Sequence, residues 1–202
     1  MLRLITPVVK LYTGKKCVPL ISEAMECFGG QGYIEDTGLP AALRDAQVTP
    51  IWEGTTNVLS LDVLRVFAGK QDVYGVFKKR IESLVNSQTS SELACATGAV
   101  RRAVQDLESF LKEATASGHA VGLDSCARQV AFGIARIYAG ALLIHQTSDT
   151  DATKSDVDVA LRWCIEQPLV DISPEWIKSS RIELDRDIVF ENFAANSWNH
   201  KL

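Results

Sequence analysis

The sequence lacks an excess of positive charge. Its 202 residues hold 21 lysines and arginines against 25 aspartates and glutamates, a formal net charge of -4. Chains that attract nucleic acid or anionic lipid through a broad basic surface carry the opposite balance. The composition, 47% hydrophobic and 23% charged, is typical of a soluble globular chain and not of a disordered one. We therefore expect no nucleic acid partner.

Closely spaced cysteines are also absent. The five cysteines are odd in number and stand at least ten residues apart, which matches neither a disulfide framework nor a C-x-x-C metal or redox motif. We interpret them as reduced and mostly buried thiols: Cys17, Cys27, Cys95, Cys126 and Cys164.

No apolar run is long enough to cross a membrane. The longest, residues 131–144, is interrupted by Arg136 and is shorter than the roughly 20 residues that a span needs, so it predicts a core helix. The first residues contain no signal-peptide core. His200-Lys201-Leu202 is a poor match to the peroxisomal Ser-Lys-Leu signal, and we interpret it as chance. The expected location is intracellular, with mitochondrial and peroxisomal sites both open.

No stretch alternates polar and apolar residues as a half-buried strand does, whereas apolar residues recur at helical spacing along most of the chain. The pattern predicts an all-α fold, with a helical piece at residues 1–69 joined to a helical bundle at 70–202. Glycine and proline predict an irregular loop from Gly30 to Pro50, apart from a short helical stretch at 41–46. The predicted helices cover 2–28, 57–67, 72–85, 90–115, 123–146 and 151–166, and a last one starts at Ser173-Pro174.

Three short patterns occur in order within residues 22–65. They are Glu23-Ala-Met-Glu26-x-x-Gly29-Gly30-Gln-Gly-Tyr33, then Leu43-Arg-Asp-Ala46, then Ile51-Trp-Glu53-Gly-Thr-x-Asn57. Alone, the glycines fit a flexible turn, Arg-Asp fits a surface pair, and Glu-Gly-Thr fits a helix entrance whose dipole favours a carboxylate.

Together, in this order and at these separations, the patterns resemble the C-terminal segment of the acyl-CoA dehydrogenases. Trp52 and Asn57, where most members have Tyr and Gln, resemble the AidB-like branch, and so does Glu26 in place of Gln. The resemblance is close over residues 1–69. Residues 70–202 resemble the extra domain of that branch in length and helical character. The resemblance to the family implies a fold made of the C-terminal helices of an acyl-CoA dehydrogenase-type four-helix bundle, followed by an additional helical bundle.

The resemblance also implies roles for individual residues. Glu53 stands where the family carries its catalytic base, which takes the α-proton of an acyl-CoA while a hydride leaves the β-carbon. The cofactor would be FAD, with Thr55 and Asn57 near the flavin, and with the backbone at Gly29 and Gly30 approaching its diphosphate or adenosine portion from a neighbouring subunit. The acyl-CoA would contact Trp52 and Gly54.

The residues around Glu53 allow the same chemistry. A carboxyl desolvated beside Ile51 and Trp52 would have a raised pKa, which suits a general base, while the helix N-terminus behind it favours the charged form. Without the flanking patterns, Glu53 would be interpreted as a helix-entrance carboxylate with no chemistry.

Arg44, Asp45 and two histidines receive structural interpretations. Arg44 and Asp45 are expected to form a buried pair that holds the loop before Glu53. His119 and His145 have no second histidine or carboxylate at metal-ligand spacing, so the sequence predicts no metal site.

Two functions stay open. The first is part of an FAD-dependent dehydrogenase that works as a homo-oligomer, dimer or tetramer, and passes electrons to an electron-transfer flavoprotein or to oxygen. The second is a non-catalytic helical module for oligomerisation or for binding nucleic acid or acyl-CoA. In either case residues 1–69 alone would expose an apolar face that must pair with a second copy or with residues 70–202: Leu4, Val8, Leu11, Leu61 and Leu64.

Overall fold

The described part of the chain is helical and contains no strand, which confirms the all-α prediction. A computed structural model describes residues 1–69, 71–87, 90–116, 120–173, 176 and 178–190. The helices are α1 (Leu2–Glu26), α2 (Gly30–Tyr33), α3 (Leu39–Val48), α4 (Thr56–Phe67), α5 (Val73–Val85), α6 (Ala94–Ala116), α7 (Ala120–Ser125), α8 (Ala127–Gln146), α9 (Lys154–Ile165) and α10 (Ser179–Phe190), with short 3-10 turns η1 (Glu35–Thr37) and η2 (Ser91–Leu93).

The segment from Gly30 to Pro50 differs from its prediction. The predicted helical stretch at 41–46 is present within the longer α3, but the rest, predicted as a loop, is largely filled by α2, η1 and the ends of α3. Gly38 takes a left-handed φ of 75° between η1 and α3, and Pro40 lies in the first turn of α3, where its missing N–H is not needed. Glycine and proline here mark helix ends and not a loop. The last described helix begins at Ser179; for the predicted start at Ser173-Pro174, Pro174 lies outside the described residues.

Helix α8 occupies the centre of the molecule. It packs against α1, α4, α5, α6 and α9, and several of its apolar side chains are fully buried. Among the described helices, α8 alone is long and apolar enough to cross a membrane. However, 56% of its apolar stretch is buried inside the protein. Its apolar run therefore has the burial expected of a core helix.

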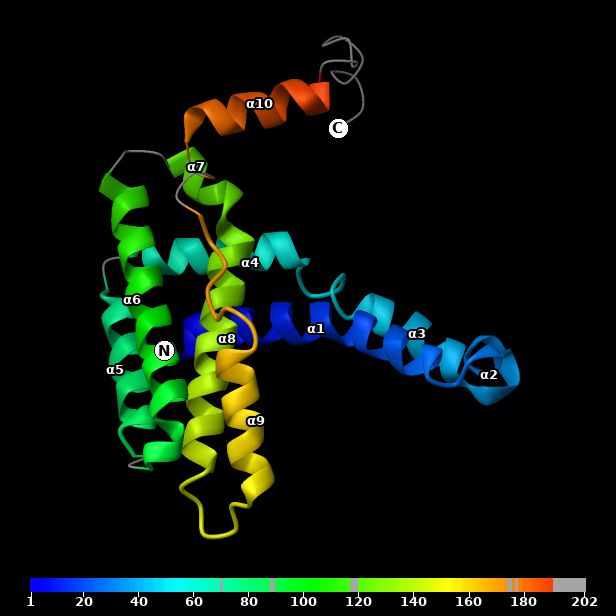
Figure 1. Cartoon of the computed structure of the whole chain (residues 1–202). Helices are drawn as coiled ribbons and strands as arrows, with labels where there is room; N and C mark the ends of the chain where they lie inside the picture. Colours follow the sequence, from blue (N-terminus) through cyan, green and yellow to red (C-terminus); the bar gives the residue numbers. More distant parts are fainter. Residues whose placement is uncertain (70, 88–89, 117–119, 174–175, 177, 191–202) are drawn as a thin grey trace.

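Helices α1 and α4 cross the long axes of the four bundle helices α5, α6, α8 and α9 (Figure 1). Leu4, Val8 and Leu11 of α1 are buried, and they share one apolar core with α4 and with the bundle. This apolar face was predicted to pair either with a second copy or with residues 70–202, and in the structure it packs against residues 70–202. Self-association therefore has no basis in Leu4, Val8 or Leu11, although Leu61 stays half-buried.

The second half of α1, together with α2, η1 and α3, extends away from the bundle (Figure 1). We call this segment, residues 14–48, the arm. Gly32 is buried against α1, where a Cβ would lie 2.1 Å from the Met25 carbonyl oxygen. Several large apolar side chains on the arm are exposed to solvent: Leu20, Phe28, Tyr33, Ile34 and Val48.

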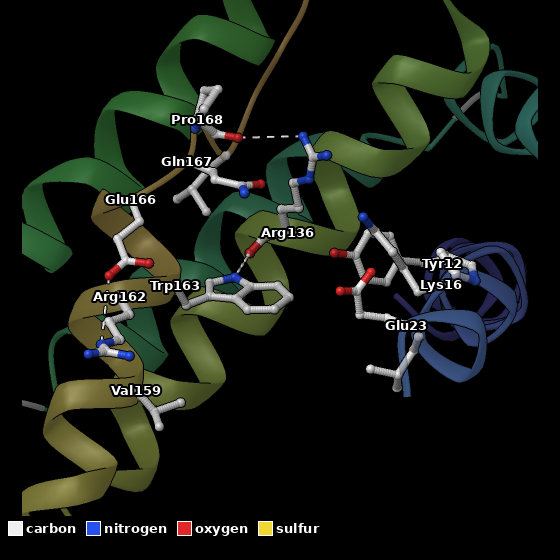
Figure 2. A pocket seen from close by; sticks show the side chains of 13 residues that line it. Tyr12, Lys16, Glu23, Arg136, Val159, Arg162, Trp163, Glu166, Gln167 and Pro168 are labelled. Atoms are coloured by element: carbon white, nitrogen blue, oxygen red, sulfur yellow. Dashed lines mark hydrogen bonds and ion pairs between the residues drawn. The ribbon is translucent and has the colours of Figure 1, made fainter. Parts of the chain in front are cut away.

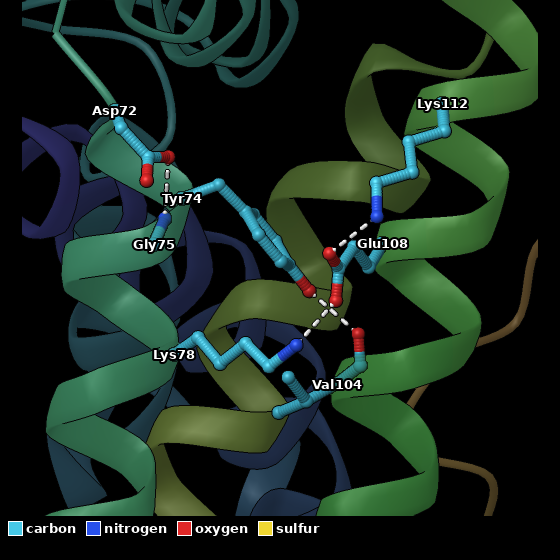
Figure 3. Close-up of polar contacts among 7 residues, drawn as sticks. All are labelled: Asp72, Tyr74, Gly75, Lys78, Val104, Glu108 and Lys112. Atoms are coloured by element: carbon cyan, nitrogen blue, oxygen red, sulfur yellow. Dashed lines mark hydrogen bonds and ion pairs between the residues drawn. The ribbon is translucent and has the colours of Figure 1, made fainter.

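A polar cluster joins α5 to α6 (Figure 3). The Tyr74 hydroxyl donates to the Val104 carbonyl at 2.6 Å, and burial raises the pKa of Tyr74. Glu108 accepts from Lys78 and from Lys112, both at 2.6 Å. The hydrogen bonds from Lys112 and Lys78 lower the pKa of Glu108 to about 2.

The cysteines are free, but fewer are buried than predicted. Cys126 and Cys164 are buried, Cys17 is half-buried, and Cys27 and Cys95 are exposed. Burial raises the pKa of the Cys164 thiol to about 11, so this thiol stays protonated at neutral pH. Cys27 is the C-cap residue after α1, and Cys95 lies on a solvent-facing side of α6, so the prediction of mostly buried thiols was wrong for these two.

Candidate functional site

Glu53 lies in a tight turn between α3 and α4. Its φ is 52°, and it is the one non-glycine residue of the described chain in the left-handed region. For an L-residue this conformation costs about 1–2 kcal/mol. Gly54 follows with a φ of 106°, which only glycine adopts readily, and a Cβ there would lie 2.9 Å from Leu59. The turn therefore requires glycine at position 54 and places strain at position 53.

The carboxylate of Glu53 is exposed, so the predicted desolvation is absent from this chain. Ile51 and Trp52, expected to shield it, are themselves 61% and 59% exposed. No side-chain hydrogen bond or ion pair of Glu53 occurs among the described residues. Glu53 thus contributes no packing or pairing that would explain a glutamate in a strained turn.

Two further predicted site residues adjoin this turn. Thr55 is the N-cap residue of α4, but its hydroxyl makes no capping hydrogen bond. Asn57 is exposed in the first turn of α4. Within the described chain neither side chain has a hydrogen-bond partner, so both are available to a ligand beside Glu53. Trp52 and Gly54 belong to the same turn, and this proximity follows directly from sequence order.

Gly29 and Gly30 lie at the far end of the arm, near α2 (Figure 1). Gly29 has a φ of 55°, and a Cβ built on either glycine would meet no atom within 4 Å. Gly14, which contacts the segment before Glu53, is 15 residues back along a helix that rises about 1.5 Å per residue. The structure therefore does not bring these glycines together with Glu53 in one compact site.

Arg44 and Asp45 do not form the predicted buried pair. The Arg44 guanidinium instead donates to both carboxylate oxygens of Glu35, at 2.8 and 3.0 Å, and the two side chains are 62% and 67% exposed. The hydrogen bond from Arg44 lowers the pKa of Glu35. Asp45 is exposed on the same helix. The pair links η1 to α3, and the prediction failed because neighbouring residues on a helix point in different directions.

His145 has a structural contact in the described chain. The His145 Nδ1 lies 2.7 Å from the Ser87 hydroxyl, which fastens the end of α8 to the end of α5. His119 and the tripeptide His200-Lys201-Leu202 lie outside the described residues. Within the described ranges, no three histidine, cysteine or acidic side chains are grouped as metal ligands.

A groove of about 930 Å³ lies between α1, α8 and α9, and sequence reasoning did not find it (Figure 2). Trp163 forms one wall and donates from its indole nitrogen to the Arg136 carbonyl at 3.0 Å. Tyr12 packs edge-on against Trp163 from the opposite helix. Residues far apart in sequence meet here, so no local pattern signals the groove. Glu53 does not line it.

The chain matches two family descriptions in succession. Residues 3–67 match the acyl-CoA dehydrogenase C-terminal domain. Residues 72–190, more than half of the chain, match the acyl-CoA dehydrogenase 11 C-terminal domain-like family. The first match includes the Glu53 turn and the arm, and the second includes the bundle.

Similar proteins agree with these matches. The chain is 58% identical over 200 residues to acyl-CoA dehydrogenase family member 11 of Caenorhabditis elegans, covering 96% of this chain and 32% of that protein. It is 43% identical over 77 residues to the putative acyl-CoA dehydrogenase AidB of Escherichia coli (strain K12), covering 38% of this chain and 14% of that protein.

A solved structure is similar along nearly the whole chain. It is the crystal structure of Caenorhabditis elegans ACDH-11 in complex with C11-CoA, with a TM-score of 0.91, 56% identity, and coverage of 96% of this chain and 34% of that one. The chain thus spans about a third of the length of this relative. It belongs to the acyl-CoA dehydrogenase family and corresponds to the C-terminal portion of the AidB-like branch.

Proposed function

We propose that this chain is the C-terminal part of an FAD-dependent acyl-CoA dehydrogenase in which Glu53 is the general base. The Glu53 carboxylate takes the α-proton of an acyl-CoA thioester, a hydride leaves the β-carbon, and a double bond forms between the two carbons. Bound FAD would supply the hydride acceptor. A glutamate can do this because its carboxylate accepts a proton at a position fixed by the turn.

The observation that carries the proposal is the backbone of Glu53. A left-handed L-residue persists only where the surrounding structure enforces it, and such residues cluster at functional sites. Glu53 is exposed and makes no side-chain hydrogen bond or ion pair within the described chain, so polar interactions of the fold do not account for its conformation. The side chain is instead exposed to solvent, where a substrate can reach it.

The exposed groups around Glu53 fit a cofactor and a thioester. Thr55 and Asn57 offer a hydroxyl and an amide for the flavin. Trp52 offers an indole face for the acyl-CoA, and Gly54 has no side chain to block its approach. The solved relative with C11-CoA supports a thioester as the substrate class. At Gly29 and Gly30 the missing side chains leave the backbone open to a cofactor held by a neighbouring subunit.

The same proposal includes an assembly and an electron acceptor. Exposed apolar side chains on the arm suit contacts within a dimer or tetramer, or with the rest of a longer chain. Electrons would pass to an electron-transfer flavoprotein or to oxygen. We propose an intracellular location, with mitochondria and peroxisomes both left open.

The test replaces Glu53 with glutamine in a chimera that joins this chain to the N-terminal two thirds of its Caenorhabditis elegans relative. We expect Glu53→Gln to lower the rate of acyl-CoA-dependent flavin bleaching by roughly 10²–10⁴-fold, because the amide accepts no proton. The FAD content should stay unchanged. Stopped-flow absorbance measures the rate, and the flavin-to-protein ratio measures the content.

Asp106→Asn is the matched control, since it makes the same chemical change at an exposed position of α6. It should bleach at the rate of the unmodified chimera. Bleaching retained by Glu53→Gln would remove Glu53 from the role of base. A chimera that binds FAD but never bleaches would favour the non-catalytic module.

A further inference from the structure

The Glu53 turn touches α1 at two points one helical turn apart. Lys10 contacts the end of the turn and Gly14 contacts its beginning. Both contacts join residues far apart in sequence, and both reach backbone atoms of the turn. The segment from Thr49 to Gly54 therefore packs along α1 and contacts it at both ends.

The contact at Gly14 depends on the absence of a side chain. A Cβ on Gly14 would lie 2.9 Å from the Thr49 carbonyl oxygen and 3.2 Å from its carbon, both backbone atoms. The Thr49 hydroxyl donates to the Ala46 carbonyl at 2.7 Å and also lies 3.2 Å from the Gly14 carbonyl. The start of the turn is thus held against α1 by close backbone approach.

The contact at Lys10 holds the other end. The Lys10 ammonium donates to the Gly54 carbonyl, and this is the one hydrogen bond in the described chain that reaches the backbone of Glu53 or Gly54. Hydrogen bonds from a charged donor are the stronger class. Ile51 and Trp52 are bonded back to Val48. Without Lys10, the peptide group between Gly54 and Thr55 would therefore have no hydrogen-bond partner in the described chain.

The position of this charge is otherwise unfavourable. Gly54 immediately precedes the N-cap of α4, where the helix dipole is positive and repels a cation. Lys10 has no carboxylate partner in the described chain that would offset this, and its side chain is half-buried. The hydrogen bond to the Gly54 carbonyl is therefore the interaction that stabilises the Lys10 ammonium at this position.

We infer that Lys10 is a positioning residue for Glu53: its bond to the Gly54 carbonyl keeps Glu53 in the left-handed conformation from which the carboxylate reaches the substrate. The inference rests on the proposed role of Glu53 as base. Lys10 itself touches neither substrate nor cofactor and acts through the turn.

The first test examines the conformation of Glu53 without reference to catalysis. In the 202-residue chain, the Cα and Cβ chemical shifts of Glu53 report its φ. We expect Lys10→Met, which keeps the apolar stem and removes the charge, to move these shifts toward values of ordinary negative φ. Lys10→Arg should retain the original shifts, because a guanidinium also donates to a carbonyl. Lys15→Met is the matched control, as Lys15 is exposed on the same helix.

The second test measures turnover of the chimera per bound flavin. A displaced catalytic group typically lowers the rate by about 10²-fold, so Lys10→Met should reduce kcat by about 10- to 100-fold while KM for acyl-CoA changes less than about twofold. A residue that merely stabilises the fold would lower the amount of folded protein and leave kcat per flavin unchanged. Lys10→Gln, whose side chain is too short to reach Gly54, is a second variant if the methionine variant does not fold.

The outcomes separate the two proposals. Unchanged Glu53 shifts in Lys10→Met would overturn the inference, and so would changed shifts with an unchanged kcat. If Glu53→Gln keeps full activity, the proposed base is wrong. In that case the shifts alone still decide whether Lys10 holds the turn.

Discussion

At position 53 an L-amino acid occupies a backbone region that glycine adopts more easily, and the next residue is a glycine in an even more restricted region. The chain thus places a glutamate where glycine would fold more readily. Such an arrangement is expected when the side chain serves the reaction rather than the fold. Stability measurements that compare glutamate with glycine at position 53 can test this.

Replacing Glu53 with glycine removes the steric conflict between Cβ and the backbone. Part of this gain is lost to the greater freedom of glycine in the unfolded chain, so we expect the free energy of unfolding to rise by about 0.5–1 kcal/mol. Urea unfolding of the 202-residue chain measures it. Glu53→Gln keeps the Cβ and should leave stability unchanged. A glycine variant less stable than the glutamine variant would show that the turn is not strained.

At the scale of the elements, α5 and α6 are tied by the cluster around Glu108. This carboxylate accepts from one lysine on α5 and one on α6, and it holds its charge far below the usual pH range because the pKa is about 2. The two lysines are 44% and 74% exposed, so solvent screens much of the attraction. The cluster therefore adds modestly to stability and depends on pH.

We expect Glu108→Gln to lower the free energy of unfolding at pH 7 by roughly 0.5–1 kcal/mol. The folded pKa lies below the ordinary 4.5, so the stabilisation is fully present above pH 4.5 and is lost as pH falls toward 2. The difference between the two chains should accordingly shrink between pH 4.5 and pH 3. Urea titrations across this range measure it, with Asp106→Asn as reference. A difference that does not depend on pH would contradict the assigned ion pairs.

At the scale of the whole molecule, α8 joins the two parts of the chain into one core. Leu4, Val8 and Leu11 of α1 are covered by this packing, so they expose no face that demands a second copy. What stays exposed is the surface of the arm and of the Glu53 turn. In these regions the chain supplies only one side of the proposed binding sites for the cofactor and the substrate.

We expect the 202-residue chain alone to bind no stoichiometric FAD and to oxidise no acyl-CoA, although it carries the proposed base. A flavin site needs orienting groups from several elements, and this chain supplies only Thr55, Asn57 and the arm glycines. The absorbance of the purified protein after incubation with FAD and gel filtration tests this. A yellow protein that turns over acyl-CoA would show that the chain is sufficient.

The sequence by itself determined the helical fold and the family. Helical spacing of apolar residues predicted α1, α4, α5 and the apolar core of α8, because burial of one helix face is a local property of the pattern. The three short patterns around Glu53 identified the family because their order is specific, and the proposed role of Glu53 follows from that resemblance.

Only the tertiary structure decided what surrounds these elements. The partner of Arg44, the exposure of Trp52 and the contact of Lys10 with Gly54 each depend on residues distant in sequence. The left-handed φ of Glu53 also has no sequence signal, since glutamate does not favour it. Local patterns report which face of a helix is buried, whereas charges and turns are placed by long-range packing. This is why the sequence predicted Glu53 as the candidate base but did not predict the contact of Lys10 with its turn.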